Sequence, residues 1–172
     1  MDLDGFKEIN DSYGHKAGDL ILRAVGHALQ ETVREGDFVG RMGGDEFVLV
    51  LPDTDSQCSS VVAHRLADRL AAIALTMRSD GNEEDRTIEG VCASIGISSY
   101  PVNANSRRAL VEDADRTMYV AKNSGKGNIV ISIARPAGPE PKAPAAAVTQ
   151  FMTEISEIVD RPPNEPGEPK DG

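Results

Sequence analysis

Residues 41–47 (RMGGDEF) combine backbone freedom with negative charge. Gly43 and Gly44 allow the backbone to turn tightly and to approach a phosphate group closely. Asp45 and Glu46 follow at once and offer the hard oxygen ligands that magnesium prefers. Taken alone, the segment predicts either a phosphate and metal site or a polar hairpin turn. A second acidic segment favours the first of these.

That second segment is residues 2–11 (DLDGFKEIND), which begins at the end of an expected first strand. In a ferredoxin-like sheet the first and third strands are antiparallel neighbours, so the end of one lies beside the start of the other. Asp2 is therefore expected close to Glu46, with the carbonyl of Leu3 nearby. Two carboxylates and a carbonyl at one sheet edge predict a site for two magnesium ions and a triphosphate.

The elements that must position these residues follow from hydrophobic spacing and turn residues. Apolar side chains at helical spacing predict helices over residues 20–33, 56–75 and 106–125, with Ser106 as an N-cap and Gly125 as a stop. Alternating apolar residues predict a strand over residues 91–97, and short strand-like runs predict strands over residues 38–41 and 47–51, joined through Gly43 and Gly44. Residues 1–3 are expected to end a first strand and residues 128–133 to form the last one. Residues 77–87 are expected to form a charged loop. The order is that of a ferredoxin-like β-α-β-β-α-β core, an α+β fold, with an added helix and strand.

Composition limits the classes of protein that the sequence can encode. Of 172 residues, 40% are hydrophobic and 27% are charged, as in globular domains, and the net charge is -10. This charge argues against broad nucleic-acid binding, which needs a basic surface. No apolar run approaches the roughly 20 residues of a membrane-spanning helix, and no export signal opens the sequence. We therefore expect a cytoplasmic chain without membrane insertion. Cys58 and Cys92 are expected to be buried, and they form no zinc pattern with the histidines.

The C-terminal part of the chain differs from the first 133 residues. Residues 134–147 are rich in proline and alanine and are typical of a linker. Residues 148–160 (VTQFMTEISEIVD) have the spacing of a short amphipathic helix. Residues 161–172 are expected to be a disordered tail. The sequence thus predicts one folded domain over residues 1–133.

Five motifs carry a family resemblance because they occur in the family's order and spacing. They lie at residues 2–11 (DxDxFKxxND), 14–19 (GHxxGD), 41–47 (RxGGDEF), 94–96 (SIG) and 115–122 (DxxxYxAK). Together they resemble the GGDEF family of diguanylate cyclases, which has a nucleotidyl cyclase-like fold. The family normally has a further segment upstream with a DxLTGLxNR-type motif. The resemblance therefore implies a domain that lacks its usual N-terminal segment and has a short first strand.

The resemblance implies a role for each matching residue. Asp2, Glu46 and the carbonyl of Leu3 would bind metal, and Asn10 and Asp19 would read the guanine edge. Residues implied at the phosphates and ribose are Phe6, Lys7, Gly43, Gly44, Asp45, Lys122 and Lys126. Of all these, Glu46, Asp45 and Lys7 are the implied catalytic group. Taken alone, Asn10 could instead cap a turn and Lys122 could be a solvated helix residue. Lys126 replaces the family's more frequent arginine, which predicts weaker phosphate binding.

The implied reaction condenses two GTP molecules into cyclic di-GMP and pyrophosphate, for bacterial second-messenger signalling. The 3′-hydroxyl of one GTP would attack the α-phosphate of the other. Magnesium, or manganese in its place, would be the cofactor, with two ions per GTP. One chain offers one GTP site, so a homodimer is expected for catalysis.

A further motif, residues 34–37 (REGD), matches the RxxD inhibitory site of the family in composition and spacing. Arg34 and Asp37 would bind the product cyclic di-GMP, with Arg65 as a secondary contributor. A surface ion pair is the ordinary explanation for such a motif. A second interpretation of the chain follows from it: a catalytically silent GGDEF remnant that serves as a cyclic di-GMP receptor through this site.

Overall fold

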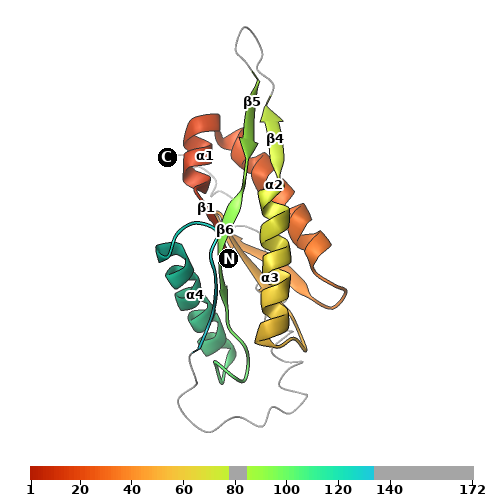
Figure 1. Cartoon of the computed structure of the whole chain (residues 1–172), viewed down its shortest axis with the longest axis vertical. Coiled ribbons are helices and arrows are strands. Elements are labelled where there is room, and N and C mark those ends of the chain that lie inside the picture. Colours follow the sequence, from red (N-terminus) through yellow and green to blue (C-terminus); the bar gives the residue numbers. More distant parts are fainter. Residues whose placement is uncertain (78–84, 134–172) are drawn as a thin grey trace, which may run out of the picture.

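A computed structural model describes residues 1–77 and 85–133, and this part of the chain contains four helices and seven strands (Figure 1). In chain order they are β1 (Asp2–Asp4), α1 (Phe6–Tyr13), α2 (His15–Thr32), β2 (Phe38–Gly43), β3 (Glu46–Val50), α3 (Ser56–Ala71), β4 (Ala74–Met77), β5 (Arg86–Glu89), β6 (Cys92–Ile97), α4 (Arg107–Asn123) and β7 (Ile129–Ile131). Residues 134–172, which include the expected linker, amphipathic helix and tail, lie outside the described residues.

Five strands form one sheet in the order β2-β3-β1-β6-β7. The first four are antiparallel and have the ferredoxin-like order, whereas β7 is parallel to β6 and is reached through α4. The fold predicted from the sequence, a ferredoxin-like core with an added helix and strand, is therefore confirmed. β1 lies at the centre of this sheet although it has three residues.

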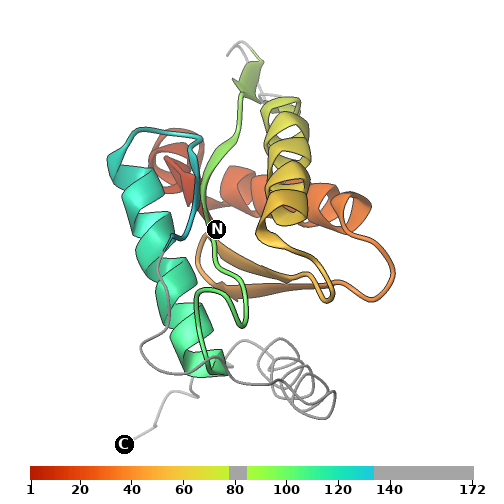
Figure 2. The same cartoon turned by 60° about the horizontal axis from the view of Figure 1, so that its bottom comes forward.

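One face of the sheet carries the hydrophobic core. Leu3, Phe47 and Ile95 are each 6% exposed or less and belong to one cluster with buried residues of α2 and α3. Ile21 and Leu29 of α2 have no exposed surface at all. Each such side chain stabilises the fold by about 1.5–3 kcal/mol when it leaves water. This core fixes α2 and α3 on one side of β6 (Figure 2).

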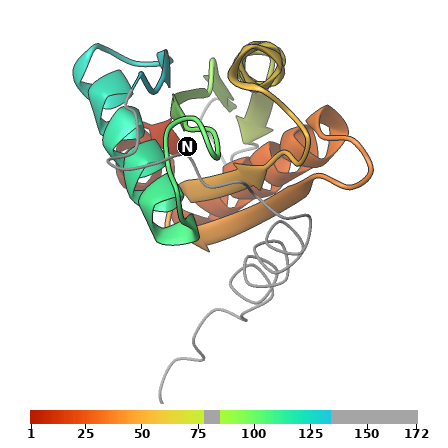
Figure 3. The ribbon, with the colours of Figure 1, turned by 90° about the horizontal axis from the view of Figure 1, so that it is seen from below.

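The opposite face is covered by α4, which contacts β6 and β7. Figure 3 shows α4 well separated from α3. A Cβ at Gly96 of β6 would overlap Ala114 O and Met118 N and would lie 2.8 Å from Met118 Cα. The helix backbone thus rests directly on the strand, which explains the need for glycine in the 94–96 motif. Side chains alternate along a strand, and Leu3 of β1 faces the core on the other side of the sheet. Asp2 and Asp4 therefore point to the face that α4 covers.

Local capping explains where two helices begin. Asp55 Oδ1 accepts a hydrogen bond from Cys58 N at 2.7 Å at the start of α3. Ser106 Oγ accepts from Ala109 N at 3.2 Å at the start of α4, so the predicted Ser106 cap is confirmed. None of the helices in residues 1–77 and 85–133 combines the length and apolar character needed to cross a bilayer.

The structure corrects three predictions about individual elements. Residues 6–13 form α1, and α2 begins at His15 rather than at residue 20. The helix expected to reach residue 75 ends at Ala71, because Ala74–Met77 pairs with Arg86–Glu89 as a hairpin. The expected loop over residues 77–87 was therefore wrong at both of its ends. This hairpin projects from the rest of the molecule (Figure 1).

The cysteines also differ from expectation. Cys58 lies on the first turn of α3 and is exposed, and Cys92 at the start of β6 is half-buried. The expectation that both are buried was wrong: Cys58 is exposed because α3 presents its first turn to solvent, and Cys92 is only half-buried.

Candidate functional site

Asp2 and Glu46 lie directly opposite each other in the antiparallel pair β1–β3. Opposite residues point to the same face of a sheet, so the two carboxylates share the face that α4 covers. Asp2 is 5% exposed, whereas Glu46 is exposed. The predicted closeness of Asp2 and Glu46 is confirmed by this register.

The carboxylate of Asp2 is only partly satisfied. Its Oδ2 lies 2.6 Å from Lys122 Nζ, which reaches it from the last turn of α4. Its Oδ1 is buried and accepts no hydrogen bond from any described residue. An ionised oxygen in this position normally has a partner, because an unpaired buried charge costs several kcal/mol. The atom is therefore suited to a cation.

Lys122 is held as a cation at this site. Burial alone would lower the pKa of Lys122. The hydrogen bond and charge of Asp2, with two further aspartates nearby, outweigh burial and raise the pKa above its ordinary value. Lys122 therefore keeps its positive charge throughout the neutral pH range.

The GGDE segment forms the hairpin between β2 and β3. Gly44 has φ +53°, a left-handed conformation that glycine adopts without strain, and the pairing shifts between Arg41 and Gly43. Arg41 Nε and Nη2 both donate to Gly44 O, at 2.9 and 2.6 Å. Leu3 N donates to Asp45 O at 3.1 Å and fastens the hairpin to β1. The segment is thus both a hairpin turn and part of the acidic site, so the two alternatives that the sequence left open are compatible.

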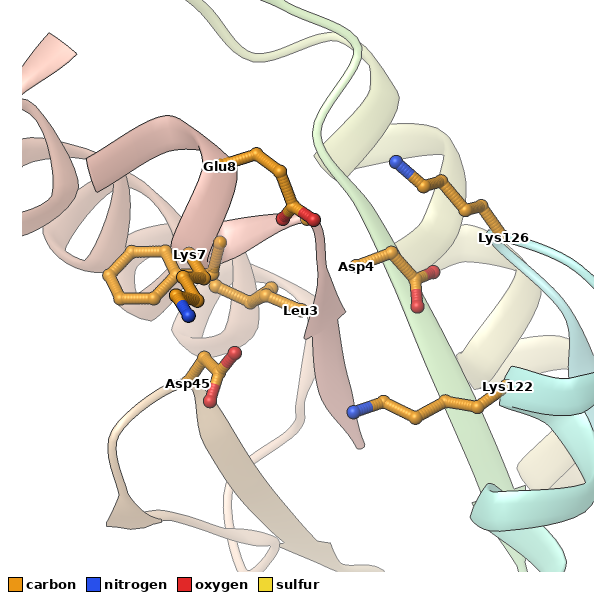
Figure 4. A pocket seen from close by; sticks show the side chains of 9 residues that line it. Leu3, Asp4, Lys7, Glu8, Asp45, Lys122 and Lys126 are labelled. Atoms are coloured by element: carbon orange, nitrogen blue, oxygen red, sulfur yellow. The ribbon is translucent and has the colours of Figure 1, made fainter. Parts of the chain in front are cut away.

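An open cavity of about 350 Å³ lies between β1, α1, the hairpin and the end of α4. Its lining is Leu3, Asp4, Gly5, Phe6, Lys7, Glu8, Asp45, Lys122 and Lys126. Figure 4 shows Lys7 and Lys122 on either side of Asp45, with Lys126 beyond Asp4. Three lysines around one cavity can bind a polyphosphate. The family resemblance predicted Phe6, Lys7, Lys122 and Lys126 near the phosphates, Asp45 near the ribose and metal, and the carbonyl of Leu3 as a metal ligand, and all six residues line this cavity.

The two residues expected to read guanine come from adjacent helices. Asn10 lies on α1 and Asp19 on α2, with Asp19 exposed. A Cβ at Gly18 would overlap Asn10 Oδ1 and lie 3.0 Å from Asn10 Cγ. The Asn10 side chain therefore rests on the residue next to Asp19, and Gly18 provides the space that it occupies.

Asp4 is a residue of the site to which the sequence analysis gave no role. Its Oδ1 accepts a hydrogen bond from Ser94 Oγ at 2.8 Å, and its Oδ2 accepts from Gly127 N at 2.7 Å. Asp4 thus links β1 to β6 and to the loop that carries Lys126. The DxD spacing puts Asp2 and Asp4 on one face and could have drawn attention to Asp4, but sequence spacing does not reveal the Gly127 contact.

The segment 34–37 forms a separate corner between α2 and β2. Arg34 Nε pairs with Asp37 Oδ1 at 3.4 Å, and Arg34 Nη2 donates to Pro52 O at 2.8 Å and to Thr54 Oγ1 at 3.1 Å. The side chain of Asp37 is 5% exposed and that of Arg34 is 63% exposed. Arg65 of α3 donates to Thr32 O at the end of α2. The side chain of Arg65 thus contacts the last turn of α2 at Thr32, two residues before Arg34.

The fit of a metal to these residues can be judged from the donors. In residues 1–77 and 85–133, no three side chains among His, Cys, Asp and Glu converge on one point. Asp2 and Glu46 supply two carboxylates, and Leu3 lines the cavity beside them. Two carboxylates with an unpaired buried oxygen suit magnesium, which is commonly held by one or two carboxylates together with water and substrate phosphates.

Comparison with known proteins agrees with this geometry. Residues 1–128 match the family model described as diguanylate cyclase, GGDEF domain. Diguanylate cyclase A of Treponema denticola is 36% identical over 132 residues, which cover 77% of this chain and 34% of that protein. The bifunctional diguanylate cyclase/cyclic di-GMP phosphodiesterase MucR of Pseudomonas aeruginosa is 39% identical over 126 residues, which cover 73% of this chain and 17% of that protein. The chain thus spans about a third or less of these relatives.

Solved structures give the same result. The GGDEF domain of PA1120 (YfiN or TpbB) from Pseudomonas aeruginosa is 37% identical and superposes with a TM-score of 0.66, over 76% of this chain and 78% of that one. The active GGEEF domain of a diguanylate cyclase from Vibrio cholerae is 29% identical, with a TM-score of 0.62 over 76% and 78%. With the family model matched over residues 1–128, this chain belongs to the GGDEF domain family of diguanylate cyclases.

Proposed function

We propose that this chain is a diguanylate cyclase that condenses two GTP molecules into cyclic di-GMP and pyrophosphate. The observation that carries the proposal is the buried Asp2, whose Oδ1 has no partner among the described residues, beside Glu46 and Lys122. A domain that only senses cyclic di-GMP has no need of such a carboxylate, which is paired with Lys122, one of three lysines that line the cavity. Relatives named as diguanylate cyclases support the same activity.

The residues of the cavity would divide the binding of GTP between them. Lys7, Lys122 and Lys126 would neutralise the phosphates, and the start of α1 would present backbone N–H groups from Phe6 and Lys7. The N–H groups at the start of a helix lack partners within the helix, which makes them suitable for an anion. The hairpin at Gly43 and Gly44 would allow close approach of the phosphate chain.

Asn10 and Asp19 would select guanine over adenine. A carboxylate can accept from the N–H groups of the guanine edge, and an amide can donate to its carbonyl. Their placement on α1 and α2 supports this assignment, because Asn10 lies against Gly18, the residue before Asp19 in the sequence. ATP would leave both groups with unmatched partners, and such a loss disfavours binding strongly.

Asp2, Glu46 and the Leu3 carbonyl would hold magnesium or manganese. Bound there, the metal would lower the pKa of the attacking 3′-hydroxyl and neutralise charge on the leaving pyrophosphate. Asp45 would lie near the ribose and the metal. The described residues provide one set of these groups per chain, so two chains must face each other to bring the 3′-hydroxyl of one GTP to the α-phosphate of the other.

Arg34 and Asp37 would bind cyclic di-GMP as an inhibitory product, with Arg65 contributing. The guanidinium suits guanine and phosphate recognition. The corner lies on elements other than those of the cavity, so occupancy there would act on catalysis without filling the GTP site. Signalling through cyclic di-GMP would then be limited by its own product.

The test is incubation of the purified chain with GTP and magnesium, followed by chromatographic detection of cyclic di-GMP. Wild type is expected to form product and Glu46→Gln to form none. Glu112→Gln is the matched control, because Glu112 only pairs with Arg108 on the surface, about 15 Å along α4 from Lys122. A folded wild-type chain that binds cyclic di-GMP but makes none would overturn the cyclase and establish the receptor.

A further inference from the structure

Two aspartates of β1, Asp2 and Asp4, point to the same face of the sheet but have different surroundings. Asp2 has one oxygen without a partner among the described residues, and its other oxygen lies 2.6 Å from Lys122 Nζ. Asp4 has both oxygens occupied by hydrogen bonds, one from Ser94 Oγ and one from Gly127 N. These two bonds hold the Asp4 carboxylate between β6 and the loop at Gly127, and charge-assisted bonds of this kind are strong.

From this difference we propose that Asp4 is a positioning residue that holds Lys126 at the cavity, and that it is not a metal ligand. Gly127 N is the backbone group next to Lys126, so the bond from Gly127 to Asp4 fixes the backbone from which the Lys126 side chain extends. The bond from Ser94 anchors Asp4 to the buried strand β6.

The loop needs such an anchor. Residues 124–127 are exposed, and both Gly125 and Gly127 have positive φ, at +123° and +72°. Glycines allow many backbone conformations, so without an external contact the loop would sample positions that carry Lys126 away from the cavity. With Asp4 in place, Lys126 Nζ lies over Gly5, 3.2 Å from the position that a Cβ there would take.

The anchor also joins the two walls of the cavity. Asp4 is followed directly by Gly5 and by the start of α1, which form one wall, and it binds the α4–β7 loop, which belongs to the other wall. The role of Asp4 toward nucleotide rests on the proposed function. The hydrogen bond to Gly127 does not, and it can be measured separately.

Substitutions of Asp4 can separate the role of its hydrogen bonds from the role of its negative charge. In Asp4→Asn, the side-chain oxygen can still accept from Gly127 N, and its NH₂ can donate to the Ser94 hydroxyl, which rotates to accept. This variant should keep the loop in place, whereas Asp4→Ala should release it. A metal ligand would be damaged by both changes, as expected for Asp2→Asn.

The measurement is equilibrium binding of a non-reactive GTP analogue with magnesium, for Asp4→Ala, Asp4→Asn, Lys126→Ala and the double variant Asp4→Ala/Lys126→Ala. Loss of one charged contact corresponds to roughly tenfold weaker binding. Asp4→Ala and Lys126→Ala should each show a loss of about this size, the double variant no more than either, and Asp4→Asn little change. The proposal would be overturned if the two losses of affinity multiplied in the double variant. It would also be overturned if Asp4→Asn lost as much affinity as Asp2→Asn.

Amide hydrogen exchange at Gly127, read by NMR without nucleotide, gives a second readout. The Gly127 amide should be protected in wild type and in Asp4→Asn and should exchange rapidly in Asp4→Ala. An unprotected Gly127 amide in wild type would overturn the anchor, whatever the nucleotide data. A protected amide in a wild-type chain that binds no GTP analogue would instead contradict the proposed function. If Asp4→Ala does not fold, Ser94→Ala replaces it, and unchanged Gly127 exchange in that variant would count against the anchor.

Discussion

Two acid–base pairs mark the two proposed nucleotide sites, and they differ in how their bonding capacity is used. Asp2 and Lys122 come from β1 and α4 and meet only because the chain is folded, and Asp2 Oδ1 still lacks a described partner. Arg34 and Asp37 are three residues apart, and Arg34 also binds Pro52 O and Thr54 Oγ1. The first pair is ready for a ligand, whereas a ligand at the second must replace existing hydrogen bonds.

Because of this difference, the geometry of the two sites should depend to different degrees on the packing of the rest of the fold. The Asp2 site needs α4 seated on β6, so changes in distant packing should reach it. In the Arg34 site the ion pair itself is local, and the bond from Arg34 N to Asp37 Oδ2 at 3.0 Å does not depend on the Arg34 side chain. Strong binding is expected where the fold leaves an unsatisfied charge, and weaker, exchangeable binding where it does not.

The largest expected effect comes from Asp2→Asn, and comparing it with Arg34→Ala tests whether the two sites have different functions. Asp2→Asn removes the charge that would hold the metal and should lower the rate of cyclic di-GMP formation by at least about a hundredfold. Arg34→Ala should leave the initial rate within about threefold, because a surface contact contributes little, but should abolish inhibition by added cyclic di-GMP. Initial rates with and without added product are the measurement. Equal effects of the two variants on the initial rate would show that the sites are not distinct.

The second prediction concerns the seating of α4. Gly96→Ala would place a methyl group against the backbone of Ala114 and Met118, which cannot move aside cheaply. The helix should shift, withdraw Lys122 from Asp2, and lower stability by about 1–3 kcal/mol. Thermal unfolding and GTP binding measure the two consequences. Gly26→Ala in α2 is the matched control, since a Cβ there meets nothing within 4 Å, and it should be stabilising by about 0.5–1 kcal/mol. Unchanged GTP binding in a folded Gly96→Ala chain would contradict the coupling of α4 to the site.

The third prediction concerns recognition of the guanine base in the proposed GTP site. Gly18→Ala would displace Asn10, whose Oδ1 occupies the space of the added methyl group. GTP should bind roughly tenfold more weakly, the cost of one lost hydrogen bond of a strong type, and discrimination against ATP should fall with it. Competition between GTP and ATP analogues measures both effects. If weaker GTP binding came with unchanged discrimination, Asn10 would have no part in reading the base.

The smallest expected effect is in the pH dependence of stability. The pKa of Lys122 is raised in the folded chain, so the Asp2–Lys122 pair contributes its full stability below the ordinary lysine value of 10.5 and loses it as pH rises through the folded pKa. The melting temperature of Lys122→Met should therefore lie below that of wild type from pH 7 to pH 9, and the gap should narrow above about pH 10.5. A gap that stays constant to pH 11 would mean that packing of the Lys122 side chain, not its charge, stabilises the wild type.

Sequence reasoning was most successful where residue types and sheet topology constrain each other. The order of strands places Asp2 opposite Glu46, and this register could be predicted because a ferredoxin-like sheet allows few alternatives. Ser106 as a cap followed from its chemistry alone. In these cases local preference and global fold agree.

The misses have specific physical causes. The motif of residues 2–11 drew attention to chemistry, although Phe6, Ile9 and Tyr13 have the spacing of one helix face and α1 could have been found from them. The β4–β5 hairpin pairs strands across a charged segment, where alternation over four residues is too short to outweigh helical spacing before it. The bond from Gly127 N to Asp4 joins residues 123 positions apart, and no sequence pattern encodes such a contact.

The most direct test of the account is to locate a bound divalent ion in the folded chain. Manganese would be added to isotope-labelled protein with a non-reactive GTP analogue, and paramagnetic broadening of backbone amide signals would be measured by NMR. The account expects strong broadening at Asp2, Leu3 and Glu46 and much weaker broadening at Arg34 and Asp37. Broadening centred on the Arg34–Asp37 corner, or no broadening at Asp2 and Glu46 while the analogue is bound, would contradict it.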